Sequence, residues 1–184
     1  LRNVVFDYNR THGTSNPYYE GGSGLVIFSN GPVSITNISA TGNSFNGLSI
    51  RDASSVSILR NLPSGNNTFN NNGVVIKGGS GLNIAADINV VLNRVEAREN
   101  SGSGAYIQAD TGSVTITGTT NLPAQFIENM GYQVGSPTLE GMMAGLHVDS
   151  AYGVRLTNVA ANENYGAGAY VRSYSPVSIL GTFN

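Results

Sequence analysis

The sequence contains a long internal repeat, in which residues 24–59 return as residues 145–180 at a constant offset of 121 positions. Many residues are identical at this offset, among them Gly24/Gly145, Ser29/Ser150, Val33/Val154, Asn37/Asn158, Asn43/Asn164, Gly47/Gly168 and Arg51/Arg172. The segment Val56–Leu59 returns unchanged as Val177–Leu180. A fixed internal period is typical of proteins whose units stack, because one unit cannot bury its apolar face alone.

A shorter period lies inside the long one. A glycine, a small or aliphatic residue, any residue and then Ile or Val recur six times, and we predict that these glycines open successive coils: Gly24, Gly47, Gly73, Gly104, Gly145 and Gly168. Each is followed by an alternating aliphatic pair such as Val33 and Ile35. Four such coils make one long repeat. We interpret residues 1–184 as one continuous domain that forms a piece of a longer tandem-repeat chain.

The segments between the glycines have the composition of β-strands. They alternate apolar and polar residues, are rich in Val, Ile, Thr and Tyr, and are bounded by Gly, Asn, Ser or Pro, which predicts an all-β fold. Charged residues make up 11% of the chain, against roughly 25% in ordinary domains. The net charge of −2 does not indicate the excess of basic residues that binds nucleic acid, so nucleic acid is not an expected partner. The apolar runs are too short to span a bilayer, so no membrane insertion is expected.

Asparagines recur at the ends of the coils. Asn tolerates the left-handed backbone conformation at tight corners, and identical amides stacked at strand spacing can bond to one another along a column. We therefore predict a structural ladder formed by one asparagine from each of five coils: Asn43, Asn72, Asn100, Asn129 and Asn164.

The glycine-led coils and the asparagine column resemble the right-handed parallel β-helix proteins of the pectin-lyase-like superfold. They are most similar to the β-helical repeats of large secreted bacterial surface and adhesin-like proteins. The resemblance implies a single-stranded β-solenoid of about seven coils, located outside the cell or on its surface. Irregular stretches would then be corner insertions: residues 10–23, 61–72, 78–88 and 130–144.

Strand alternation also predicts which side chains face outward. In each coil, the second and fourth residues after the opening glycine should point away from the core. Three consecutive coils then stack two columns of outward side chains, Tyr106, His147 and Tyr170 beside Gln108, Asp149 and Arg172. This face can hold a sugar or a partner protein. Alternatively, the aromatic column only stabilises the sheet through contacts between neighbouring strands. In the coil assigned to Gly73, the outward positions fall on Val75 and Lys77.

The same resemblance raises an enzymatic alternative, because pectate lyases and polygalacturonases are similar β-helices. A lyase needs several carboxylates that converge on Ca²⁺, and the eleven acidic residues of this chain are scattered. We therefore expect a non-enzymatic structural or adhesive module without a cofactor or metal. A polysaccharide lyase or hydrolase, and a glycan-binding module of the tailspike type, are the alternatives. The expected partners are neighbouring coils or further copies stacked end to end, with surface glycans as an additional candidate.

Overall fold

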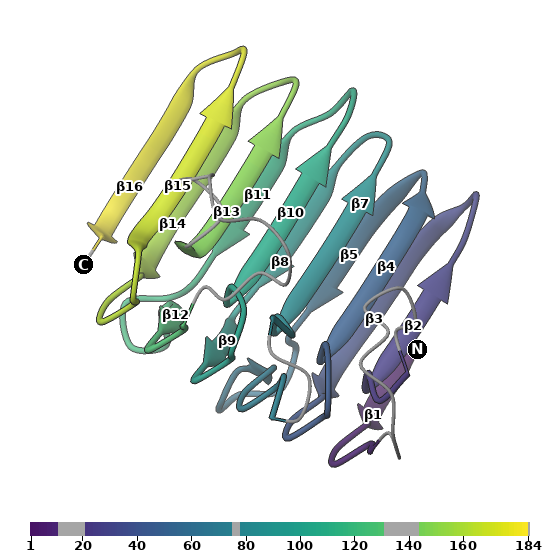
Figure 1. Ribbon diagram of the computed structural model, residues 1–184. Helices are drawn as coiled ribbons and strands as arrows, with labels where there is room; N and C mark the ends of the chain where they lie inside the picture. The colour runs from purple at the N-terminus through teal and green to yellow at the C-terminus, as the bar shows by residue number, and fades with distance from the viewer. Residues whose placement is uncertain (11–20, 75–77, 131–143, 184) are drawn as a thin grey trace.

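The computed structural model describes residues 1–10, 21–74, 78–130 and 144–183. Within these residues the chain forms sixteen strands and no helix, and therefore no helix that could cross a membrane (Figure 1). The strands are β1 (Arg2–Val5), β2 (Leu25–Phe28), β3 (Pro32–Ser39), β4 (Leu48–Ala53), β5 (Ser55–Leu59), β6 (Asn67–Thr68), β7 (Leu82–Ala86), β8 (Val90–Asn93), β9 (Val95–Arg98), β10 (Ala105–Ala109), β11 (Val114–Thr117), β12 (Ala124–Ile127), β13 (Ala144–Ser150), β14 (Val154–Ala160), β15 (Ala167–Ser173) and β16 (Val177–Phe183).

The strands form two sheets in which every pairing is parallel. One sheet has six strands in the order β15-β13-β10-β7-β4-β2, and the other has ten strands that include β3, β5, β8, β11, β14 and β16. The chain passes through one strand of the six-stranded sheet, then through the ten-stranded sheet, and then returns (Figure 1). We call each such passage a rung. The predicted all-β architecture with parallel strands is confirmed.

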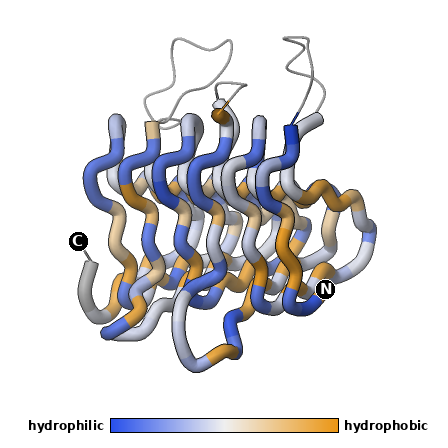
Figure 2. Tube along the Cα trace, turned by 90° about the horizontal axis from the view of Figure 1, so that it is seen from below, coloured by the Kyte–Doolittle hydropathy of each residue, from blue (hydrophilic) through white to orange (hydrophobic). Residues whose placement is uncertain are grey.

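The core consists of aliphatic columns that run through successive rungs. Parallel register sets Leu48 beside Leu82, and it sets Val56 beside Val90 in the second sheet. These side chains are buried because alternate residues of each strand face inward. Figure 2 shows the resulting alternation of hydrophobic and hydrophilic residues along the chain. Burial of each Leu, Ile or Val side chain contributes about 1.5–3 kcal/mol.

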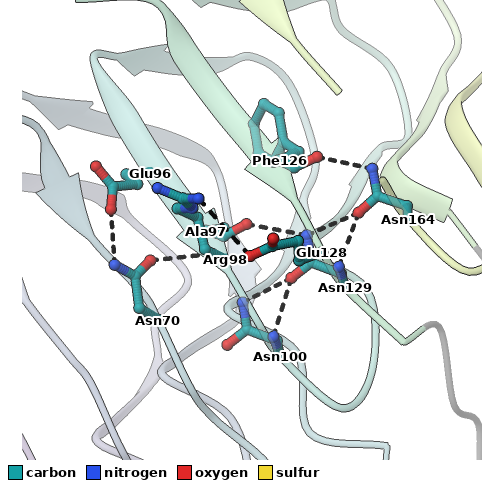
Figure 3. Close-up of polar contacts among 9 residues, drawn as sticks. All are labelled: Asn70, Glu96, Ala97, Arg98, Asn100, Phe126, Glu128, Asn129 and Asn164. Carbon is teal, nitrogen blue, oxygen red and sulfur yellow. Dashed lines mark hydrogen bonds and ion pairs between the residues drawn. The ribbon is translucent and has the colours of Figure 1, made fainter. Parts of the chain in front are cut away.

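The five predicted ladder asparagines form one hydrogen-bonded column, which Asn9 extends by a further rung. The Nδ2 atom of each asparagine donates to the Oδ1 atom of the asparagine in the next rung, at 2.9–3.0 Å. The backbone N–H of each asparagine donates to the same Oδ1 atom. Figure 3 shows the column from Asn100 through Asn129 to Asn164. Between the two ends of the column, the hydrogen bonds satisfy polar groups that are almost fully buried, those of Asn43, Asn72, Asn100 and Asn129.

The residue before each ladder asparagine has a left-handed backbone conformation. Its φ angle lies between 54° and 69° in all six rungs, at Tyr8, Gly42, Asn71, Glu99, Glu128 and Glu163. This conformation costs a residue other than glycine roughly 1–2 kcal/mol. It reverses the chain at the corner and places the following asparagine in the column, where the ladder hydrogen bonds offset the cost.

The prediction that Gly73 opens a coil is wrong. The strand of that rung begins after Gly81, and β7 pairs with β4 on one side and β10 on the other. A Cβ atom on Gly47 would lie 2.6 Å from the carbonyl oxygen of Gly81, and one on Gly81 would lie 2.6 Å from that of Gly104. Gly81 therefore holds the crowded opening position in which only glycine fits.

Two of the predicted corner insertions contain regular structure. The stretch 78–88 includes β7, and the stretch 61–72 includes β6 and the ladder residue Asn72. The outward positions of the corrected rung are held by Asn83 and Ala85, which pair with Tyr106 and Gln108. Residues Val75 and Lys77 lie outside the described residues, as do most of the stretches 10–23 and 130–144.

Candidate functional site

The predicted aromatic column lies on the outer side of the six-stranded sheet. Tyr106 of β10 pairs with His147 of β13, and His147 pairs with Tyr170 of β15. The ring centroids are 4.7 Å and 4.9 Å apart, and the planes are inclined by 34° and 37°. His147 is only 4% exposed, whereas Tyr170 is 37% exposed. The rings pack against one another, so the faces of the central imidazole are not open to a ligand.

The second predicted column contains a two-point ion pair. Arg172 donates from Nε to Asp149 Oδ1 at 2.6 Å and from a terminal nitrogen to Asp149 Oδ2 at 3.1 Å. The hydrogen bond to Asp149 raises the pKa of Arg172, and the negative charge of Asp149 acts in the same direction. His147 Nε2 lies 3.4 Å from the same Oδ2 atom. Asp149 thus joins the two columns.

Gln108 completes the second column and turns toward the next corner of the rung. Its Nε2 atom donates to Asp110 Oδ1 at 2.8 Å. Asp110 directly follows β10 and is exposed. The amide therefore holds the Asp110 carboxylate in place and keeps its own carbonyl oxygen available as an acceptor.

A pocket of about 220 Å³ lies beside these columns. Its lining comes from three adjacent rungs and consists of Tyr106, Gln108, Ala109, Asp110, Asp149, Ser150, Ala151, Arg172 and Tyr174. Four of the six predicted face residues line it, whereas His147 and Tyr170 do not. The structure brings all six together on one face but divides them into a packed aromatic column and a pocket wall.

A third outward column, which was not predicted from the sequence, lies next to the first two. Ala109 pairs with Ser150, and Ser150 pairs with Ser173, so the next residues along these strands are Asp110, Ala151 and Tyr174. All three line the pocket. The alternation that predicted the first two columns, extended by one more outward position, would have found them. The two remaining lining residues are Ala109 and Ser150. Ser150 lies at the end of β13 and its hydroxyl donates to the carbonyl oxygens of Gly112 and Tyr152.

The pocket carries more negative than positive charge. Two carboxylates, Asp110 and Asp149, face a single guanidinium, Arg172. Burial raises the pKa of Tyr106, the charge of Asp149 raises it further, and Arg172 opposes the shift. Tyr106 therefore presents a neutral hydroxyl at physiological pH. Within the described residues, no group of three or more His, Cys, Asp or Glu side chains is placed to hold a metal ion. The pocket offers hydrogen-bond donors and acceptors beside an aromatic ring.

Comparisons with protein-family models, with curated proteins and with solved structures find no match to this chain.

Proposed function

We propose that this chain is a right-handed parallel β-helix of the pectin-lyase-like type, with about seven coils, and that it serves as a structural and adhesive repeat module. The parallel pairing of every strand and the passage of the chain between two sheets support the architecture. In this proposal, the module belongs to a secreted protein of the cell surface or of an extracellular filament. It is not an enzyme in this role.

The observation that carries the structural role is the unbroken column from Asn9 to Asn164. Each asparagine makes the same two hydrogen bonds to the next rung, and the aliphatic core residues continue in the same register. Because stability in such stacks is a sum over neighbouring rungs, rungs can be added without a change of fold. The long repeat spans four such steps, from β2 to β13. A chain organised in this way can become longer and expose more surface while each rung keeps its structure.

The last rung supports the proposal that further coils or another copy of the chain stack on it. In the described residues, β15 pairs only with β13 and β16 pairs only with β14. Val177 and Ile179 continue the buried columns of Val154 and Leu156, yet they are 45% and 52% exposed. An open strand edge of this kind is a template for another strand.

The experiment that tests the structural role is native mass spectrometry and electron microscopy of the protein isolated from its source. We expect either a longer polypeptide that contains further 121-residue units or end-to-end assemblies. A mature polypeptide of 19.2 kDa that stays monomeric at high concentration would contradict the proposal. Replacement of Val177 by Lys should abolish end-to-end assembly, because the new charge would have to be buried. The same change at the solvent-facing Ser57 of β5 is the matched control.

A carbohydrate-active role is the second candidate, as a polysaccharide lyase or hydrolase or as a tailspike-type glycan-binding module. The observation that favours it is the pocket with Asp110 and Asp149 beside Arg172. Assays of polysaccharide degradation with and without Ca²⁺ test the enzymatic form. Turnover that disappears with the Asp149→Asn variant would support it and would contradict the proposal of a non-enzymatic module.

A further inference from the structure

The two copies of the long repeat differ in the character of several side chains on the outer side of the six-stranded sheet. Inward residues keep their apolar character, as in Leu25 and Leu146, whereas three of the four outward pairs change, Val26/His147, Phe28/Asp149 and Ser49/Tyr170, and the fourth, Arg51/Arg172, is unchanged. On the ten-stranded sheet, the outward residues Ser57 and Leu59 of β5 are identical to Ser178 and Leu180 of β16, whereas Ser34 of β3 is replaced by Arg155 of β14.

This comparison separates packing from recognition. The first copy holds Val26, Phe28 and Ser49 on strands with the same parallel register and similar inward residues. Stacking of the rungs therefore does not require His147, Asp149 or Tyr170. Stacking requires only some outward-facing side chain at these positions. The second copy nevertheless has an aromatic column and an ion pair there, beside a pocket. Asp149 can therefore serve the pocket that it lines, whereas His147 and Tyr170 lie in the aromatic column beside it.

The volume of the pocket limits the size of its ligand. About 220 Å³ corresponds to roughly seven water molecules, and it is below the roughly 300–1,000 Å³ of clefts that enclose drug-sized ligands. The pocket is also partly open to solvent, and one of its lining residues, Tyr174, is exposed. It can take a single ring of a longer molecule whose remaining parts lie over the surface.

The charges of the pocket decide which kind of ring it accepts. Asp149 neutralises the charge of Arg172 and occupies two of its five N–H donors, so the guanidinium attracts a second carboxylate less strongly than an unpaired arginine would. A carboxylate on the ligand would also meet Asp110 and Asp149, and like charges held close together repel. Hydroxyl groups, in contrast, donate to carboxylates and accept from the amide of Gln108.

We infer that this pocket binds one neutral, hydroxyl-rich sugar ring of a glycan and discriminates against uronic acids. The inference rests on the adhesive part of the proposed function. Asp110 and Asp149 accept hydrogen bonds from sugar hydroxyls, Gln108 donates to them, and the ring of Tyr106 packs against the apolar side of the sugar. Arg172 fixes the orientation of the Asp149 carboxylate.

The test measures binding of two sets of oligosaccharides of equal length to the 184-residue chain by titration calorimetry and on a glycan array. One set contains neutral gluco-, galacto-, manno- and N-acetylglucosamine oligomers, and the other contains oligogalacturonates. We expect the wild-type chain to bind at least one neutral set and to bind it at least about tenfold more tightly than the uronates. The Asp149→Asn variant should bind the neutral set about tenfold more weakly and should bind uronates more tightly, because it leaves Arg172 free to pair with their carboxylates.

Two substitutions taken from the chain itself serve as probe and control. Tyr106→Asn introduces the residue that β7 holds at the paired position, Asn83, and should weaken neutral binding while the fold is kept. Arg155→Ser introduces the residue of the other repeat copy, Ser34, on the ten-stranded sheet, and should leave binding unchanged. Circular dichroism and the melting temperature show whether each variant is folded.

The possible results distinguish this inference from the function on which it rests. Tighter binding of uronates than of neutral sugars by the wild-type chain would overturn the inference and leave an adhesive role intact. No glycan binding at all would overturn both. Neutral binding that survives both Asp149→Asn and Tyr106→Asn in folded protein would show that the pocket is not the site.

Discussion

Each ladder asparagine uses a single oxygen atom for two hydrogen bonds. The Oδ1 atom of Asn100 accepts from both the backbone N–H and the side-chain Nδ2 of Asn72, while Nδ2 of Asn100 donates to Asn129. The loss of this side chain therefore leaves the buried backbone N–H of Asn72 without a partner, and it removes one of the two hydrogen bonds of the Asn72 Nδ2 atom, which also donates to the carbonyl oxygen of Ala40. Water cannot replace the amide easily, because the column is almost fully buried.

We predict that Asn100→Ala lowers the free energy of unfolding by about 2–4 kcal/mol, because each buried donor left without a partner costs about 1–3 kcal/mol. Equilibrium unfolding in urea measures the change. Asn89→Ala is the matched control, because Asn89 accepts from Ser113 at an exposed corner and its loss should change stability by less than about 0.5 kcal/mol. Equal effects of the two substitutions would refute the structural role of the column.

Tyr106 makes stability depend on alkaline pH. Burial and the nearby Asp149 charge raise its pKa in the folded protein above the ordinary value of 10.0. The folded state then holds this proton more tightly than the unfolded state, so the stabilising contribution is complete below about pH 10 and is lost as pH rises through the raised pKa.

We therefore predict that the wild-type chain loses more stability than the Tyr106→Phe variant between pH 9 and pH 11, the range around the ordinary tyrosine pKa. Urea unfolding at a series of pH values measures this difference. Ultraviolet difference spectra of the two proteins should show Tyr106 ionising later than an exposed tyrosine. Parallel pH profiles for the two proteins would show that the pKa of Tyr106 does not differ between the folded and unfolded states.

The type and spacing of individual residues determined which parts of the site could be predicted from the sequence. The asparagine column follows from the recurrence of one amide at coil ends, and the six face residues follow from the period of two in strands. The left-handed conformation of Glu99, Glu128 and Glu163 was not predictable from residue type, because glutamate has no preference for it. The close packing of His147 between two tyrosines depends on ring orientations, which spacing does not specify.

The position of β7 shows that a short motif cannot decide which of two glycines opens a rung. Both Gly73 and Gly81 are followed by an aliphatic residue and, two positions later, by Ile, so each satisfies the same pattern. The neighbouring strands choose between them, since only Gly81 lies in the column with Gly47 and Gly104. Glycine spacing in the folded chain then alternates between 23 residues and the longer intervals of 34 and 41.

The turn between β5 and β6 depends on one buried cation. Arg94 begins the corner before β9 and is only 9% exposed. Its terminal nitrogens donate to the backbone carbonyl oxygens of Arg60, Leu62 and Pro63, so one side chain holds the polar groups of the turn in the rung below. Burial of Arg60, together with its repulsion from Arg94, lowers the pKa of Arg60.

We predict that Arg94→Ala lowers the free energy of unfolding by roughly 2–3 kcal/mol, because hydrogen bonds from a charged group are among the stronger ones and Arg94 is buried. Hydrogen exchange should show faster opening of residues 60–66. Arg98→Ala is the control, because Arg98 forms a partly exposed pair with Glu128 at 3.7 Å, which contributes at most about 1 kcal/mol (Figure 3). An Arg94→Ala variant as stable as Arg98→Ala would show that the turn between β5 and β6 does not depend on the hydrogen bonds of Arg94.

The internal repeat allows rungs to be added to the molecule without a change in their register. A second copy of residues 24–144 inserted between residues 144 and 145 should add four rungs in register. We predict a folded protein whose urea m-value rises by roughly two-thirds, in proportion to the added surface that unfolding exposes. Far-ultraviolet circular dichroism and urea unfolding measure the outcome.

An out-of-phase block provides the control for this insertion. Residues 36–156 inserted at the same place add the same length but break the glycine and asparagine columns, so this protein should fold poorly. If both insertions give equally stable proteins, the stack does not depend on the register that the long repeat specifies.

The parallel pairing has a mechanical consequence. Hydrogen bonds between parallel strands run from rung to rung, and the asparagine amides bond in the same direction. Tension applied to the two ends pulls on all bonds of a given layer at once, and every layer bears the same load. Such a rod yields at the layer with the fewest bonds, and among the described rungs that contain three strands, the two-residue strand β6 makes its own rung the candidate breaking point.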